Sequence, residues 1–176
     1  SARECLKNST HLITASYVSK EMAALNDEAK KRNLIFLNEM GLDPGIDHMD
    51  AVKLINQIRD SGGIPVSFKS YCGGLVSPEF DDNPWGYKFT WSPMSVVLVG
   101  QGISRYINNS RIKIVPYNRL FTNTELIDIP GIGKYEAYPN RDSILYKNSY
   151  GLHEVKNFYR GTLRKPGFGK AWNALI

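Results

Sequence analysis

Asp43 is the residue whose type and surroundings point most directly to chemistry. It stands within Gly41-Leu-Asp-Pro-Gly45, just after an apolar run that we predict to be a strand. Pro44 and the two glycines fix an unusual backbone path, because proline locks φ and glycine reaches conformations closed to other residues. Such a path can present one carboxylate to a ligand. The alternative is a structural aspartate that only binds the amides of the turn.

Ser92 stands before Pro93 at the expected start of a helix. Serine is a favoured helix cap, and proline is favoured at the first helical position. Free amides at a helix N-terminus also favour phosphate, so Ser92 could both cap the helix and contact a phosphate-bearing cofactor. We expect this helix to include Gly100 and Gly102, which indicate close packing because glycine is otherwise unfavourable in a helix.

Other patterns carry weaker signals. The segments 131–133 and 167–170 contain paired glycines but are neither a full GxGxxG motif nor a phosphate loop, so we interpret them as turns. His48 lies among Asp47 and Asp50, but neighbouring side chains at a helix start point in different directions. Capping by Asp47 is therefore favoured over metal binding, and no metal site is predicted.

The elements that position these residues follow a strand, helix, strand order. His11 to Tyr17 and Leu34 to Leu37 are expected to be buried strands, with a helix capped by Ser19 between them. This βαβ pattern is typical of a parallel sheet, where ligands collect beyond the carboxyl ends of the strands. A second helix should begin after Asp47 and stop at 62–63, where two glycines allow a left-handed turn.

The second part of the chain has a different pattern. Strand-like alternation appears over 65–72, with apolar and polar side chains on opposite faces. A long irregular stretch from 75 to 91 carries five aromatic residues, which argue against disorder. Further strands are expected over 112–115, 134–138 and 155–164, with a short helix after Asp142. The pattern as a whole indicates the α/β class.

Composition limits the class of protein. The chain has 176 residues, of which 42% are apolar, enough for one domain or parts of two. No apolar run approaches the roughly 20 residues that cross a bilayer, and the N-terminus lacks a signal core, so no membrane association is expected. Two cysteines, Cys5 and Cys72, show neither disulfide nor metal-ligand spacing and favour a reducing compartment, which predicts a cytoplasmic protein.

The net charge is +5, but the 22 basic residues are interleaved with 17 acidic ones. The run 30–32 (Lys-Lys-Arg) follows Glu28 and is typical of a solvated helix face. No stripe of basic residues with stacking aromatics is present, so no nucleic-acid partner is expected. A basic binding module and a non-catalytic fragment that keeps only an oligomer surface remain as alternatives. The positive charge also suits a small polyanionic substrate.

Six peptides, in order along the chain, together resemble the saccharopine reductase family of L-glutamate-forming saccharopine dehydrogenases. They are Thr14-Ala-Ser-Tyr-Val-Ser19, Asn38-Glu-Met-Gly-Leu-Asp-Pro-Gly-Ile-Asp-His48, Ser70-Tyr-Cys-Gly-Gly-Leu75, Tyr87-Lys-Phe-Thr-Trp-Ser92, Tyr138-Pro-Asn-Arg-Asp-Ser143 and Arg160-Gly-Thr-Leu-Arg164. The resemblance implies the end of a Rossmann-type parallel sheet over 1–45, followed over 46–176 by a mixed α/β substrate domain of the saccharopine dehydrogenase C-terminal type. Both are expected to be incomplete, so the chain is expected to be an inactive fragment by itself.

The resemblance implies an oxidoreductase of lysine metabolism that acts on a CH–NH bond. Such an enzyme interconverts saccharopine with glutamate and 2-aminoadipate 6-semialdehyde, and the hydride passes to or from NADP or NAD. The partners it implies are a small-molecule substrate, saccharopine or a similar polycarboxylate amino acid, and a second copy of the chain in a homodimer. Cofactor preference and direction stay open, because the nucleotide fingerprint is absent from the sequence.

The resemblance also assigns site residues, carried over position by position. The implied substrate contacts are Ser16, Tyr17, Asp43, Arg141, Thr162, Leu163 and Arg164. The implied cofactor contacts are Leu42, Asp43, Pro44 and Ser92. The candidate proton handlers are Asp43, Tyr17 and Cys72, and for Asp43 we favour holding the cationic amine of the substrate.

Each of these roles has a plainer alternative. Planar guanidinium groups suit the carboxylates of saccharopine, but Arg141 beside Asp142 could form a structural salt bridge. Tyr17 could be a core aromatic residue and Cys72 a small buried hydrophobic one. The loop Val76-Ser77-Pro78 departs from the family pattern. A related dehydrogenase acting on another amino-acid or polyamine-derived imine is therefore the second candidate.

Overall fold

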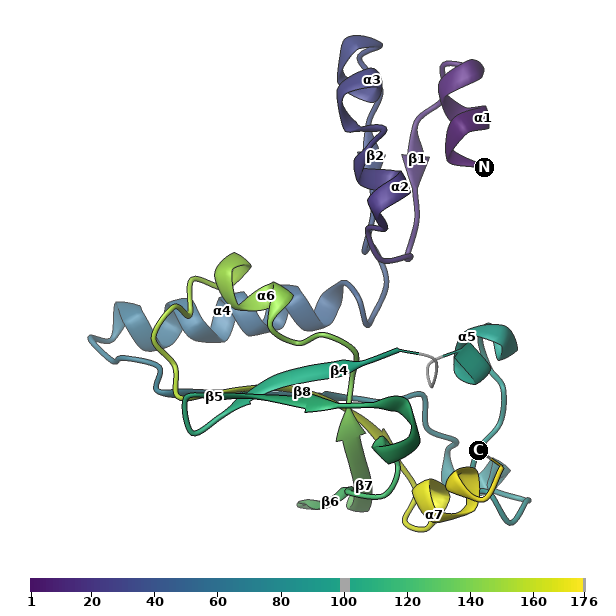
Figure 1. The fold of residues 1–176 in the computed structure, drawn as a ribbon, viewed down its shortest axis with the longest axis vertical. Helices are drawn as coiled ribbons and strands as arrows, with labels where there is room; N and C mark the ends of the chain where they lie inside the picture. Colours follow the sequence, from purple (N-terminus) through teal and green to yellow (C-terminus); the bar gives the residue numbers. More distant parts are fainter. Residues whose placement is uncertain (99–101, 176) are drawn as a thin grey trace. The chain divides into compact units, whose positions relative to one another are not determined.

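A computed structural model describes residues 1–98 and 102–175 of the chain (Figure 1). The chain forms two compact units, unit 1 over Ser1–Gln57 and unit 2 over Ile58–Ile176. Unit 1 contains α1 (Ala2–Lys7), β1 (Leu12–Ile13), α2 (Lys20–Ala23), α3 (Asn26–Lys31), β2 (Phe36–Leu37) and most of α4 (Ile46–Asp60).

Unit 1 has the predicted βαβ arrangement. β1 and β2 pair in parallel, with Leu12 opposite Phe36. Both strands are shorter than predicted, and the connecting helix is divided into α2 and α3. The predicted cap is confirmed, because the Ser19 hydroxyl accepts a hydrogen bond from the Met22 amide at 3.1 Å.

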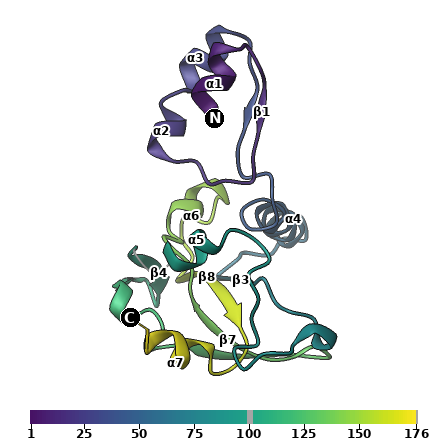
Figure 2. The same cartoon turned by 90° about the vertical axis from the view of Figure 1, so that its right-hand side faces the viewer.

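The core of unit 1 lies between its helices and one side of the strand pair. Leu6, Leu25 and Ala29 are buried, and Leu34 and Phe36 pack against them. Figure 2 shows α1, α2 and α3 on the same side of β1. The apolar residues of the βαβ pattern therefore cover one side of the strand pair.

The helix α4 begins two residues earlier than predicted, at Ile46 rather than after Asp47. Asp47 is therefore in the first turn, where its carboxylate accepts a hydrogen bond from the Gly45 amide at 2.8 Å. The predicted stop is confirmed, since α4 ends at Asp60 and Gly62 has a φ of +81°. This left-handed conformation is readily reached by glycine.

Unit 2 is built on a mixed six-stranded sheet. Its strands are β3 (Ser67–Cys72), β4 (Ser104–Asn108), β5 (Arg111–Val115), β6 (Glu125–Ile129), β7 (Gly133–Pro139) and β8 (Asn157–Arg164). The strand order is β5-β4-β8-β7-β6, and β3 pairs with β8 in parallel, whereas the other neighbours are antiparallel. The sequence predicted β3, β5, β7 and β8 but not β4 or β6.

The two faces of β8 carry different residues, because side chains alternate along a strand. Phe158, Arg160, Thr162 and Arg164 share one face, here called the α6 face after the helix α6 (Leu145–Ser149) that lies over β8 in Figure 1. At one end of this face, the ring of Phe158 stacks on Phe68 at 5.0 Å and meets Tyr150 of the turn that ends α6 at 5.9 Å. Leu163 points to the opposite face.

The other end of the α6 face is covered by an aromatic cluster. Tyr87, Val96, Leu120, Phe121, Tyr138 and Phe168 are buried together. Phe168 begins the helix α7 (Phe168–Asn173), and Tyr87 comes from the irregular stretch 75–91. That stretch contains a short 3₁₀ helix at Pro78–Phe80 and supplies a core residue. The prediction that its aromatics order it is confirmed for Tyr87.

The helix α5 spans Pro93–Leu98. The Ser95 amide donates a hydrogen bond to the Ser92 hydroxyl at 3.4 Å, so the predicted cap is confirmed. Gly100 lies outside the described residues. Gly102 is not helical, and a Cβ there would meet open space, so the close packing predicted for it is wrong.

Candidate active site

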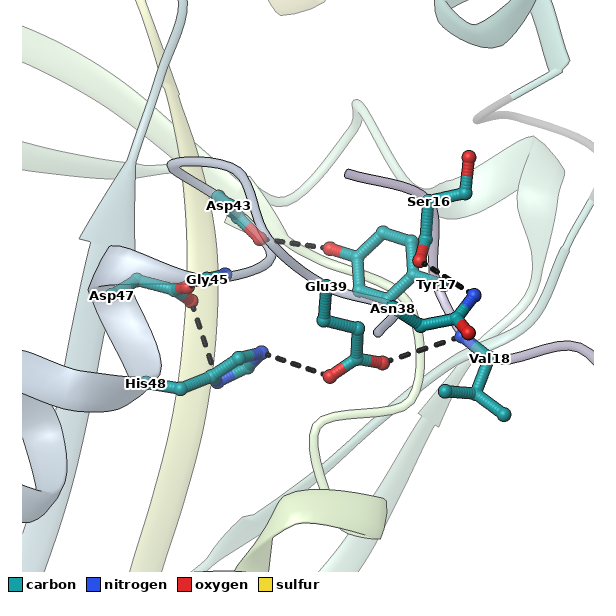
Figure 3. Close-up of polar contacts among 9 residues, drawn as sticks. All are labelled: Ser16, Tyr17, Val18, Asn38, Glu39, Asp43, Gly45, Asp47 and His48. Carbon is teal, nitrogen blue, oxygen red and sulfur yellow. Dashed lines mark hydrogen bonds and ion pairs between the residues drawn. The ribbon is translucent and has the colours of Figure 1, made fainter. Parts of the chain in front are cut away.

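Unit 1 brings Tyr17 and Asp43 together. The Tyr17 hydroxyl donates a hydrogen bond to the Asp43 carboxylate at 2.8 Å (Figure 3). Tyr17 follows β1 and Asp43 follows β2, so the parallel pairing of these strands places both residues beyond the same edge. This is the edge at which α/β sheets bind ligands. Both side chains are only partly buried, so a ligand can reach them.

The loop that carries Asp43 is closed by its own backbone. The Gly41 amide donates to the Pro44 carbonyl at 2.9 Å, and the Ile46 amide donates to the Gly41 carbonyl at 2.9 Å. Gly45 is buried with a φ of +151°, and a Cβ there would overlap the Gly41 carbonyl oxygen. The predicted unusual backbone path is confirmed, and it explains the glycine at position 45.

Ser16 and Pro44, also predicted in this site, lie beside the pair. The Ser16 carbonyl accepts a hydrogen bond from the Glu39 amide at 3.1 Å, which ties the segment after β1 to the segment after β2. Leu42 exposes 60% of its surface, and Pro44 is buried. Of the two, Leu42 is therefore the one that can offer a ligand an apolar surface.

A histidine and two carboxylates adjoin this loop. His48 Nε2 lies 3.6 Å from Glu39 Oε2, and His48 Nδ1 lies 3.7 Å from Asp47 Oδ2. Sequence reasoning considered His48 only with Asp47 and Asp50 and missed Glu39. The sequence could have pointed to this contact, because Glu39 and His48 lie within the same family-like peptide, 38–48.

Arg164 lies at the covered end of the α6 face in unit 2. Its residue surface is 4% exposed, and its guanidinium lies 4.7 Å from the Tyr87 ring, 5.4 Å from Phe168 and 5.9 Å from Tyr138. One Nη donates to the Leu163 carbonyl at 2.8 Å. The buried Nε has no hydrogen-bond partner among the described residues.

An arginine with this environment is unusual. A buried charge is costly unless it is paired, and aromatic rings offset only part of that cost. The contact of Arg164 with these three rings was not predicted, because Tyr87, Tyr138 and Phe168 come from separate segments of the chain. The guanidinium is held in a fixed place with unused donor capacity, which suits an anionic ligand.

Thr162 and Cys72 lie next to Arg164 along the same face. Thr162 of β8 is flanked by Cys72 of β3 on one side and by Tyr138 of β7 on the other. Burial raises the pKa of Tyr138, and the nearby positive charge of Arg164 opposes part of that rise. Tyr138 is therefore a neutral hydroxyl that contacts Thr162, and it was not predicted as a site residue.

The remaining predicted residues of unit 2 differ in placement. The Leu163 side chain packs with Tyr135 and Ala137 on the opposite face, so only its backbone reaches the Arg164 side. Arg141 is exposed with a φ of +46°, and the carboxylate of Asp142 lies 3.3 Å from Arg105. Asp142 thus has an arginine partner other than its neighbour. Of the predicted site residues, Ser16, Tyr17, Leu42, Asp43 and Pro44 therefore lie in unit 1, and all the others lie in unit 2.

Within residues 1–98 and 102–175, no group of three or more His, Cys, Asp or Glu side chains could hold a metal ion. No helix in these residues is long and apolar enough to cross a bilayer.

Comparison with known proteins identifies the family. Residues 41–176 match the family described as Saccharopine dehydrogenase C-terminal domain. The chain belongs to the saccharopine dehydrogenase family. The saccharopine dehydrogenase [NADP(+), L-glutamate-forming] of Saccharomyces cerevisiae is 41% identical over 175 residues, which cover 99% of this chain and 39% of that protein. The alpha-aminoadipic semialdehyde synthase of Arabidopsis thaliana is 42% identical over 170 residues, or 95% of this chain and 16% of that protein.

A solved structure supports the same family and the mixed α/β fold. The apo histidine-tagged saccharopine dehydrogenase (L-Glu forming) from Saccharomyces cerevisiae matches with a TM-score of 0.82 and 40% identity, covering 96% of this chain and 38% of that chain. The predicted resemblance and fold class are confirmed, as is the link to oxidoreductases of lysine metabolism. The chain spans less than two fifths of the length of these saccharopine dehydrogenase relatives. The domain boundary at 45–46, the homodimer, the cytoplasmic location and the individual site residues stay predictions.

Proposed function

We propose that this chain is the part of a saccharopine dehydrogenase that binds saccharopine and handles protons during hydride transfer. The complete enzyme would interconvert saccharopine and water with glutamate and 2-aminoadipate 6-semialdehyde, using NADP as its similar yeast relative is named to do. The glycine-rich dinucleotide-binding fingerprint is absent from these residues, so we assign the cradle of the cofactor's pyrophosphate to a segment outside them, while Ser92 remains a separate contact to the cofactor.

The observation that carries the proposal is the hydrogen bond between Tyr17 and Asp43. Oxidation of saccharopine begins from a secondary ammonium, which must lose a proton before hydride can leave the adjacent carbon. The Asp43 carboxylate is suited to hold that ammonium, and the Tyr17 hydroxyl fixes its orientation. With water, the resulting imine forms an amino alcohol that collapses to the amine of glutamate and the aldehyde.

Recognition of the substrate follows from its three carboxylates. Arg164 offers a buried guanidinium whose Nε is not bonded to any described residue. Arg141 offers an exposed one. We assign both to substrate carboxylates, with Thr162 as a neutral hydrogen-bonding group beside Arg164. These positive groups argue against the second candidate, a dehydrogenase for a polyamine-derived imine, because a polyamine is itself cationic.

The residues near Asp43 fit a nicotinamide ring. Leu42 exposes an apolar side chain next to Asp43, and Pro44 is buried. When bound, the cofactor accepts or delivers the hydride. We assign Leu42, Asp43 and Pro44 to its nicotinamide end. Ser92 caps α5, and its hydroxyl proton remains able to donate to a phosphate. Cys72 and Tyr17 are the further groups proposed to exchange protons with the amine or the water.

The direct test is product identification with the complete enzyme. Saccharopine, water and NADP(+) should give glutamate, 2-aminoadipate 6-semialdehyde, NADPH and a proton, with the three organic products in equal amounts, measured by the absorbance of the reduced nicotinamide and by mass spectrometry. The chain of residues 1–176 alone should give no turnover. Release of any other amine from saccharopine, or no reaction of the complete enzyme with it, would reject the proposal.

A further inference from the structure

The Tyr17–Asp43 pair is one link in a closed ring of contacts within unit 1 (Figure 3). From Asp43 the chain runs through Pro44 to Gly45, whose amide donates to Asp47 at 2.8 Å. Asp47 faces His48 at 3.7 Å, and His48 faces Glu39 at 3.6 Å. Glu39 then accepts a hydrogen bond from the Val18 amide at 3.4 Å, and Val18 adjoins Tyr17.

His48 is the member that joins the two halves of this ring. Its two ring nitrogens face different carboxylates, Glu39 from the segment after β2 and Asp47 from the first turn of α4. The side chains are mostly shielded, with exposures of 16% for His48, 23% for Glu39 and 8% for Asp47. Polar contacts in such shielded places are screened less by solvent than contacts at the surface.

The backbone of Glu39 supports the same arrangement. Its φ is +59°, a left-handed conformation that is uncommon for residues other than glycine, asparagine and aspartate. In this conformation the Glu39 amide donates to Ser16 at 3.1 Å while its carboxylate reaches both His48 and Val18. An unusual backbone that serves several contacts at once indicates a functional constraint.

We propose that His48 is a positioning residue for the Tyr17–Asp43 pair. Its imidazole, held between Glu39 and Asp47, keeps the loop 41–45 at a fixed distance from the segment that carries Tyr17. The kinetic effect of His48 rests on the proposed function. The contacts of its imidazole with Glu39 and Asp47, here called the His48 clamp, belong to unit 1 alone. His48 acts through the loop, and the reacting atoms belong to Asp43 and Tyr17.

The kinetic test is a double-mutant cycle in the complete enzyme. His48→Leu should lower kcat/KM for saccharopine by roughly 10- to 100-fold, since a displacement of about 1 Å of a reacting group has effects of that size. His48→Leu combined with Asp43→Asn should lie within about threefold of Asp43→Asn alone, because the group being positioned is already impaired. His153→Leu, at an exposed histidine of unit 2, is the matched control and should leave kcat/KM unchanged. Multiplicative effects of the two substitutions would overturn the proposal.

A second measurement on the chain itself separates failure of the clamp from failure of the proposed function. Amide hydrogen exchange of Gly45 and Val18 should be at least tenfold faster in His48→Leu, because Asp47 and Glu39 lose their common partner. Exchange in β7 and β8 should not change. Glu39→Gln, which keeps an acceptor for Val18 but removes the charge facing His48, should accelerate Gly45 alone. Unchanged exchange at Gly45 in both variants would reject the clamp whatever the enzyme's substrate is.

Discussion

Replacing Arg164 by methionine separates a substrate-binding role of the guanidinium from a structural one. Arg164 is buried, lies over three aromatic rings and donates one hydrogen bond to Leu163. Methionine keeps most of the length and the apolar contact with the rings and removes the charge. Arg111→Met, at an exposed arginine of β5, is the matched control.

Stability should change little, because opposing terms offset one another. Loss of the attraction between the cation and the ring faces costs about 2 kcal/mol, and loss of the charge-assisted hydrogen bond costs about 1.5 to 3 kcal/mol. Against this, the buried charge no longer has to be desolvated, which is worth several kcal/mol, and the unbonded Nε is removed. We expect the free energy of unfolding, measured with urea on the chain, to change by less than about 2 kcal/mol.

Substrate binding should fall much more. A charge-assisted contact with a saccharopine carboxylate contributes about 1.5 to 3 kcal/mol. Its loss corresponds to a rise in KM for saccharopine of roughly 10- to 150-fold, with KM for the nicotinamide cofactor within twofold of the unsubstituted enzyme. The reasoning is refuted if KM for saccharopine stays within twofold while unfolding becomes easier by more than about 3 kcal/mol. That result would make Arg164 a structural cation of the aromatic cluster.

Three further outcomes are expected. Asp43→Asn keeps an acceptor for Tyr17 but loses the charge, so saccharopine capture should weaken by roughly 1 to 3 kcal/mol; a kcat loss of roughly 100-fold with binding intact and one pH limb gone would instead mark Asp43 as the general base. Arg141→Lys should raise KM for saccharopine severalfold or more without affecting nucleotide affinity, since a point charge replaces a planar fork; an unchanged KM with a lower melting temperature would indicate a structural salt bridge. Burial raises the pKa of both Tyr138 and Tyr159. The stability that these two neutral hydroxyls contribute is therefore complete below the unfolded tyrosine pKa of about 10 and is lost as pH rises above it. The free energy of unfolding in urea should be lower at pH 11 than at pH 8, and Tyr138→Phe should make this difference smaller.

Much of the fold follows from patterns that act over short distances. The cap by Ser19, the stop at Gly62 and the loop around Asp43 each depend on a few adjacent residues, and each was predictable. The strand β4 was missed because its burial does not alternate: the adjacent residues Arg105 and Tyr106 are both half-buried. A period of two was therefore weak in the sequence.

The parts of the site that were missed depend on contacts between distant segments. Glu39 reaches His48 only because the loop 41–45 folds back on itself, and spacing along the chain does not reveal that closure. Tyr87 reaches Arg164 from an irregular stretch with no periodic pattern. Sequence predicted Arg164 as a carboxylate ligand through a resemblance, while its burial and its unbonded Nε became visible only in the fold.

We propose that this chain selects a secondary amine that carries carboxylates. The most direct test is the ratio of kcat/KM for saccharopine to kcat/KM for a polyamine with a secondary amine and no carboxylate, both measured with the complete enzyme at saturating NADP(+). Loss of two charge-assisted contacts of about 1.5 to 3 kcal/mol each predicts a ratio of at least roughly 100 in favour of saccharopine. Equal values, or a preference for the polyamine, would contradict it.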